Sequence, residues 1–114
     1  MNSFTCFLEK LENLLKTGNV PNQEYCVPFK THRLALAANL FSRELYKNLG
    51  KVTLGQYDHF YSLFLETLLQ ISPSDFEHEL SSLDAVSKEN LLQTLGDLLQ
   101  NRPELDLTTY TRFL

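Results

Sequence analysis

The sequence lacks the features that mark several large classes of protein. Its 114 residues contain only two cysteines, Cys6 and Cys26. That number is too small for a disulfide-based fold, and their spacing does not match the ligands of a structural zinc ion. Uninterrupted apolar runs are far shorter than the roughly 20 residues of a membrane-spanning helix. The N-terminus lacks a basic start followed by an apolar block, which argues against a secretory signal. We therefore expect a cytoplasmic protein without membrane insertion.

Motifs for catalysis are also missing. The four glycines, at positions 18, 50, 55 and 96, are too scattered to form a phosphate-binding loop. No two of the histidines, His32, His59 and His78, are spaced to bind one metal ion from the same helix. Cys26 with a distant histidine is the only combination of nucleophile and base, and nothing in its spacing supports catalysis. We expect no enzymatic activity, no cofactor and no metal site.

Charge is distributed unevenly along the chain, whose net charge is −4. Residues 30–51 contain five basic residues and one acidic residue, whereas residues 52–114 contain three basic and ten acidic residues. This acidic balance makes nucleic acid an unlikely main partner. The basic side chains gather instead in one predicted helix.

Helical periodicity dominates the remaining pattern. We predict an all-α fold in which residues 1–114 form a single domain, a bundle of about five helices with four main helices and one short one. Residues 18–30 contain Pro21 and Pro28, so they are predicted to form a long loop packed across the bundle, with Cys26 as a small core residue. The predicted helices cover about residues 3–17, 31–49, 53–71, 72–82 and 84–100, with a docked last turn within 107–114.

The stretch 53–71 has the strongest local signals. Its aromatic and aliphatic stripe is wide enough to need cover on more than one side, which predicts the central helix of the bundle. Thr53 and Gln56 fit a capping box at its start, and Gly50 fits a tight turn before it.

Several neighbouring residues receive specific predictions. Thr31 is predicted to cap the helix 31–49, and Ser72 the helix that starts at Pro73. Glu79 is expected to point outward from that short helix. Gly96 weakens the helix around it, which close packing would explain.

The helix 31–49 carries apolar residues on two faces. One face is predicted to enter the core through Leu34, Ala37, Ala38, Phe41, Leu45 and Leu49. The other combines two leucines with basic residues: Leu36, Leu40, Arg43, Lys47 and Lys51. Either this second face is covered within the monomer, or it meets a partner.

These patterns favour a non-enzymatic protein–protein interaction module, such as a small adaptor, assembly factor or regulator, that docks through the mixed apolar and basic face. The partner is another protein or a second copy of the chain in a homodimer. The alternative is a nucleic-acid-associated transcriptional regulator in which the helices 31–49 and 53–71 form a helix-turn-helix-like hairpin. Against this alternative, the second of these helices has no lysine or arginine with which to read DNA.

Overall fold

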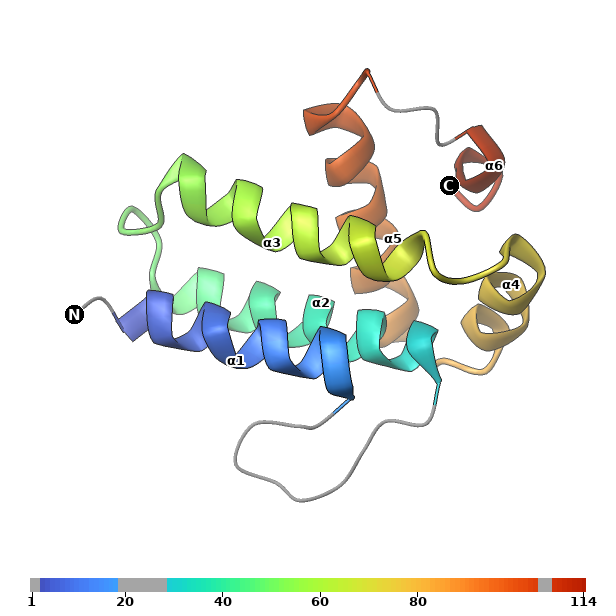
Figure 1. The fold of residues 1–114 in the computed structure, drawn as a ribbon, viewed down its shortest axis with the longest axis horizontal. Coiled ribbons are helices and arrows are strands. Elements are labelled where there is room, and N and C mark those ends of the chain that lie inside the picture. The colour runs from blue at the N-terminus through green and yellow to red at the C-terminus, as the bar shows by residue number, and fades with distance from the viewer. Residues whose placement is uncertain (1–2, 19–28, 105–107) are drawn as a thin grey trace.

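The computed structural model describes residues 3–18, 29–104 and 108–114. The regular elements in this part of the chain are all helices, without strands (Figure 1). The predicted all-α bundle of four main helices and one short helix is confirmed. The predicted packing of the loop 18–30, with Cys26, concerns residues 19–28, which lie outside the described ranges. The helices are α1 (Ser3–Thr17), α2 (Lys30–Lys47), α3 (Leu54–Leu68), the short α4 (Pro73–Ser81), α5 (Ala85–Asn101) and the single-turn α6 (Thr108–Thr111).

The bundle is organised around α2, which contacts α1, α3, α4 and α5. In Figure 1, α1 and α3 run along α2, while α5 crosses behind at a steep angle. The central position was predicted for the stretch 53–71, and this prediction is wrong. Ala35, Ala37 and Ala38 of α2 are all buried, and such short side chains let neighbouring helices approach closely.

Aromatic side chains of α2 and α3 form the middle of the core. The rings of Phe41 and Phe60 are stacked with centroids 3.9 Å apart. Phe60, Phe64 and Leu68 of α3 are fully buried. From α1, Leu11 and Leu14 complete this region with no exposed surface. The predicted apolar stripe of α3 is therefore core.

The connection between α2 and α3 follows the predicted signals. Gly50 has a φ of +81°, a left-handed conformation that favours glycine. The capping box of α3 is complete, because the Thr53 N–H donates to Gln56 Oε1 at 2.9 Å and the Gln56 N–H donates to Thr53 Oγ1 at 3.3 Å. Local sequence thus sets the direction in which α3 leaves the turn.

The start of α2 is capped from another helix. Thr31 was predicted as the cap, but α2 begins one residue earlier, and Thr31 is completely buried in its first turn. Its N–H donates to a carboxylate oxygen of Glu79 at 2.7 Å. Glu79 was predicted to point outward from α4, yet it is buried because its carboxylate satisfies an N–H at the end of α2.

The last turn was predicted to be docked, and it packs on α4. The Tyr110 hydroxyl donates to the carbonyl oxygen of Ile71 at 2.9 Å. Its ring meets Phe76 edge-on, with centroids 5.5 Å apart. Leu114, by contrast, is exposed and does not take part in this docking.

Two smaller predictions also need correction. A Cβ added at Gly96 would meet no atom within 4 Å, so close packing does not explain this glycine. Leu49 is 68% exposed rather than part of the core, because α2 ends at Lys47 and the chain turns away from the core face. Within the described ranges, no helix combines the length and apolar character required to cross a bilayer.

Candidate functional site

The five residues predicted to form the docking surface fall into two groups. Leu36 and Leu40 are half-buried and pack against the hydrophobic core. Arg43, Lys47 and Lys51 are exposed. The apolar and basic parts of the predicted surface therefore differ in character, since the leucines contribute to stability as well as to the surface.

Three exposed apolar side chains lie nearer to the basic residues at the end of α2. Tyr46 is 78% exposed, Leu49 is 68% exposed and Leu54 is 86% exposed. Sequence reasoning missed Tyr46 and Leu54 and assigned Leu49 to the core. The available signal was the turn itself, since Leu49 lies directly before Gly50 and Leu54 directly after the cap at Thr53.

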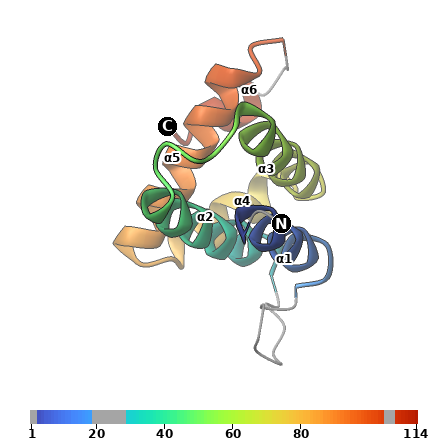
Figure 2. The same cartoon turned by 90° about the vertical axis from the view of Figure 1, so that its left-hand side faces the viewer.

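Together these residues define the α2–α3 corner: Arg43, Tyr46, Lys47, Leu49, Lys51 and Leu54. Figure 2 faces this end of the molecule, with the α2–α3 connection arching between α5 on one side and α1 on the other. Among the described residues, Arg43 and Lys51 have no ion-pair partner. The exposed Lys47 lies 3.8 Å from the half-buried Glu44, a pair three residues apart on one helix that contributes little energy. The corner is therefore both apolar and positively charged.

A groove between α3 and α5 begins at the same corner. Its volume is about 400 Å³, and we call it the α3–α5 groove. The Arg102 guanidinium lies 3.5 Å from the Asp58 carboxylate at this groove and donates to Ser62 Oγ at 3.0 Å. The lining residues are Leu54, Tyr57, Asp58, Tyr61 and Asn101.

Tyr61 also lines a smaller cavity of about 70 Å³ between α2, α3 and α5. Asp97 of α5 lines this cavity and is half-buried. Burial raises the pKa of the Asp97 carboxyl above its usual range. Burial also raises the pKa of Tyr61 to about 12, with smaller contributions from the charge of Asp97 and from Tyr57. Asp97 and Tyr61 are thus close enough for their charges to interact.

Polar contacts join α2 and α5 on the same side of the bundle. Asn39 Nδ2 donates to Ser87 Oγ at 3.0 Å, and Asn90 Nδ2 donates to Asn39 Oδ1 at 2.6 Å. These half-buried side chains satisfy one another. They fix the position of α5, and with it Asp97, relative to α2.

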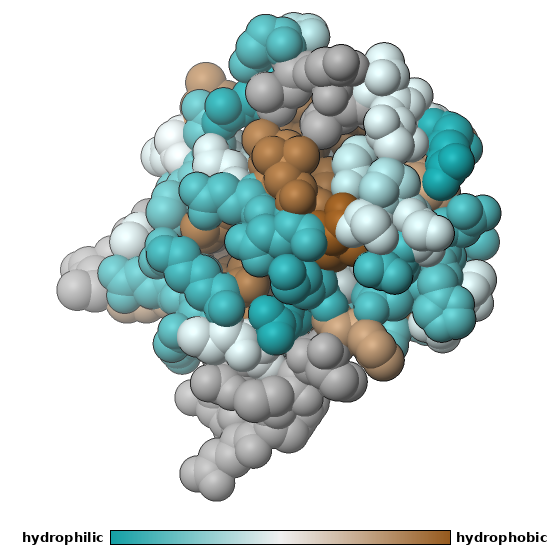
Figure 3. Space-filling model, turned by 45° about the vertical axis from the view of Figure 1, so that its right-hand side comes forward, coloured by the Kyte–Doolittle hydropathy of each residue, from teal (hydrophilic) through white to brown (hydrophobic). Residues whose placement is uncertain are grey.

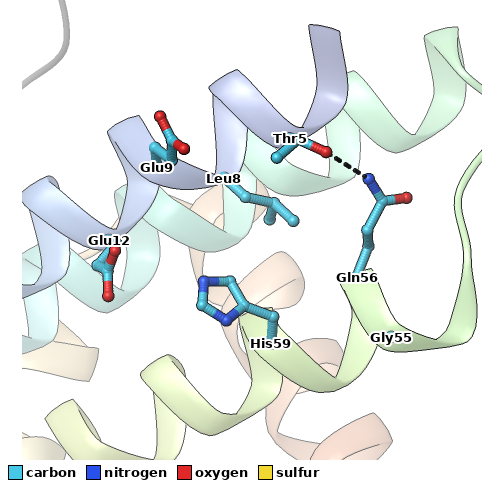
Figure 4. Close-up of a pocket in the computed structure, with 7 residues that line it drawn as sticks. All are labelled: Thr5, Leu8, Glu9, Glu12, Gly55, Gln56 and His59. Carbon is cyan, nitrogen blue, oxygen red and sulfur yellow. Dashed lines mark hydrogen bonds between the residues drawn. The ribbon is translucent and has the colours of Figure 1, made fainter. Parts of the chain in front are cut away.

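A further pocket of about 360 Å³ lies between α1 and α3 (Figure 4). Gln56 Nε2 donates to Thr5 Oγ1 at 3.2 Å across it, while Leu8 and His59 point into the space between the helices. Glu12, on its wall, pairs with Lys16 at 3.1 Å. Nowhere in the described ranges do three or more His, Cys, Asp or Glu side chains gather in a way suited to a metal ion.

The side of the molecule shown in Figure 3 is mainly hydrophilic, with hydrophobic side chains gathered at its centre. The α2–α3 corner differs from this patch because its apolar side chains lie among lysine and arginine.

Comparisons with protein-family models, with curated proteins and with solved structures found no match, so the function of this chain rests on its own geometry.

Proposed function

We propose that this protein is a non-enzymatic interaction module that binds another protein through the α2–α3 corner. The observation that carries the proposal is the exposure of Tyr46, Leu49 and Leu54 beside basic side chains. Recognition surfaces combine an apolar centre with a charged rim in this way. A matching partner presents apolar side chains together with acidic ones.

The rigid support of the corner favours this role. Gly50 and the capping box at Thr53 fix the backbone between α2 and α3. The stacked rings of Phe41 and Phe60 join the two helices just behind the corner. Because the backbone is held in place, little ordering entropy is lost when a partner binds.

The test is affinity isolation from the native source with two corner variants, Leu49→Ser/Leu54→Ser and Lys47→Glu/Lys51→Glu. All four side chains are exposed, so we expect both variants to keep the circular dichroism and melting temperature of the parent. We expect each to lose partners that the parent retains. The loss of partner binding caused by the serine substitutions should persist at high salt. The loss caused by the charge reversal should become smaller as salt screens the charges.

A matched control is Lys10→Glu/Lys88→Glu, which makes the same charge change at exposed positions of α1 and α5. This control should keep the partners. Equal capture by the corner variants and the control would contradict the proposal. Leu36 and Leu40 are less suitable for substitution because they pack against the core.

A second candidate, nucleic-acid binding by α2, is motivated by the exposed Arg43, Lys47 and Lys51. It predicts binding of DNA or RNA that weakens steeply with salt and on Lys47→Glu. The exposed Asp58 and Glu66 of α3 oppose it, because they would repel phosphates near a helix-turn-helix reader. Fluorescence anisotropy with labelled DNA and RNA at low salt separates the two functions, since a protein-docking module shows no such binding.

A further inference from the structure

We propose that the partner of the α2–α3 corner is a second copy of this chain, bound in a closed dimer with two-fold symmetry. The inference rests on the proposed function, because it names what the corner binds. The second surface of the dimer is the α1–α3 pocket, the space of about 360 Å³ between these two helices (Figure 4). In the dimer, the corner of each copy meets the α1–α3 pocket of the other.

The corner and the α1–α3 pocket differ in charge. The lysines and the arginine of the corner are exposed and make it positive. Two carboxylates line the pocket, Glu9 and Glu12, and no lysine or arginine of the described ranges lines it. Glu9 is exposed and has no ion pair among the described residues. Glu12 lies 3.1 Å from Lys16, four residues further along the same helix, and such pairs contribute little energy.

The two surfaces lie next to each other. Leu54 belongs to the corner, and the two residues that follow it, Gly55 and Gln56, line the pocket. Figure 2 shows the start of α1 and the α2–α3 connection at the same end of the molecule. A two-fold rotation about an axis between the two surfaces places the positive half of each copy against the negative half of the other. A symmetric interface requires this property, since one patch must be complementary to itself.

One side chain holds the two surfaces in a fixed relation. Gln56 Oε1 accepts the Thr53 N–H at 2.9 Å, and Gln56 Nε2 donates to Thr5 Oγ1 at 3.2 Å. The same amide therefore joins the turn at the corner to α1, the helix that carries the carboxylates of the pocket. Because both halves are positioned before two copies meet, little ordering entropy is lost on association.

Apolar contact in the dimer comes from Leu54 and from the pocket. Leu54 is 86% exposed, so its side chain gains little from the fold of its own copy. Leu8 points into the space between α1 and α3, and Gly55 lines that space without a side chain (Figure 4). The pocket is therefore open to an aliphatic side chain, and Leu54 of the second copy supplies one.

The acidic residues of α4 are a less suitable counterpart for the corner. Asp75 and Glu77 are exposed, but α4 lies at the opposite end of the molecule (Figure 1). A copy whose corner bound α4 of its neighbour would leave its own α4 free for a third copy, and the assembly would grow as an open chain. The α1–α3 pocket lets two copies satisfy both surfaces at once.

The test is sedimentation velocity of the full chain over a range of protein and salt concentrations. We expect a monomer–dimer equilibrium that shifts toward monomer as salt screens the charges. Lys47→Glu/Lys51→Glu makes the corner resemble the pocket in charge, and Glu9→Lys/Glu12→Lys makes the pocket resemble the corner. Each variant alone should dimerise about tenfold more weakly than the parent. An equimolar mixture of the two should dimerise again, because a negative patch then meets a positive patch over both halves.

Matched controls make the same charge changes away from both surfaces. Lys88→Glu/Arg112→Glu controls for the corner variant and Glu89→Lys/Glu104→Lys for the pocket variant, and all four positions are exposed. Both controls should dimerise like the parent. Circular dichroism should show that every variant keeps the helix content of the parent.

Four results would overturn the inference: a parent that stays monomeric, assemblies that grow beyond a dimer, charge-reversed variants that dimerise like the parent, or a mixture that stays monomeric. None of them contradicts the proposed function, which fails instead if the corner variants capture the same proteins as their control in affinity isolation. Sedimentation uses the purified chain alone, so the two failures are distinguishable.

Discussion

At the scale of single residues, Asp97 is an ionisable side chain that the fold partly removes from water. It is half-buried beside Tyr61, and its burial raises its pKa. If this position required only a polar side chain, asparagine would lower the stability of the fold less, because it carries no charge to bury.

Asp97 makes stability depend on pH in a definite direction. Its folded pKa lies above the ordinary value of 3.8, so between these two pKa values the folded chain binds more protons than the unfolded chain. The free energy of unfolding contributed by this group therefore falls as pH rises through that window. Asp97→Asn removes the effect, and we expect the variant to exceed the parent in stability at neutral pH and to lose this advantage in acid.

Urea denaturation of both proteins from acid to neutral pH measures this difference. Glu89→Gln controls for the general change in net charge. A variant that is less stable than the parent at neutral pH would mean that the Asp97 carboxylate is favourably paired in the folded state.

At the scale of helices, local sequence chooses most starts and stops. Ser72 accepts the N–H of Asp75 at 3.2 Å, directly before Pro73 opens α4. Thr53 and Gln56 do the same for α3. Gly18 is left-handed directly after α1, and Gly50 is left-handed in the turn that follows α2. These signals act over a few residues, so they can be read from sequence. Thr31 is not the cap that the sequence predicted, because the Glu79 carboxylate of α4 accepts an N–H at the start of α2.

Two glycines allow a paired prediction about helix energetics. Gly96 lies inside α5 with open space where a Cβ would lie, so Gly96→Ala should stabilise the fold by about 0.5–1 kcal/mol through helix propensity. Gly50 also has open space but a φ of +81°, so Gly50→Ala should destabilise it by about 1–2 kcal/mol. Thermal and urea unfolding measure both changes. Stabilisation by Gly50→Ala would show that the turn relaxes, and the corner would then be less rigid than the structure indicates.

At the scale of the whole molecule, contacts distant in sequence hold together the end of the bundle that contains α4 and α6. Glu79 of α4 caps α2 from 48 positions away, and Tyr110 reaches Ile71 across 39 positions. Such contacts order the α4 and α6 end. The α2–α3 corner at the other end depends instead on local turn signals and on the stacked aromatic rings.

The Glu79 contact predicts a graded loss of stability. Glu79→Ala leaves the buried Thr31 N–H without an acceptor, which should lower the free energy of unfolding by about 1–3 kcal/mol. Glu79→Gln keeps an acceptor oxygen and loses only the charge at the start of α2, so its effect should be smaller. Urea denaturation at neutral pH compares them.

Glu77→Ala is the control on the same helix. Its carboxylate lies 3.5 Å from Arg112 in a pair of exposed side chains, so its removal should change stability little. If Glu79→Ala lowered the free energy of unfolding no more than Glu77→Ala, a water molecule would have to replace the carboxylate at the Thr31 N–H. The cap would then not hold α4 against α2.

The sequence by itself determined the all-α fold, the core stripe of α3, and the caps of α3 and α4, because periodicity and capping act between residues close in the chain. It also identified Arg43, Lys47 and Lys51 as a basic group. Only the tertiary structure decided that α2 is central, that Glu79 is buried, and that Leu49 is exposed. Only the tertiary structure placed Tyr57, Tyr61 and Asp97 around neighbouring cavities. Burial depends on which helices meet, and that choice follows from the side-chain shapes of several helices at once rather than from the pattern of any one of them.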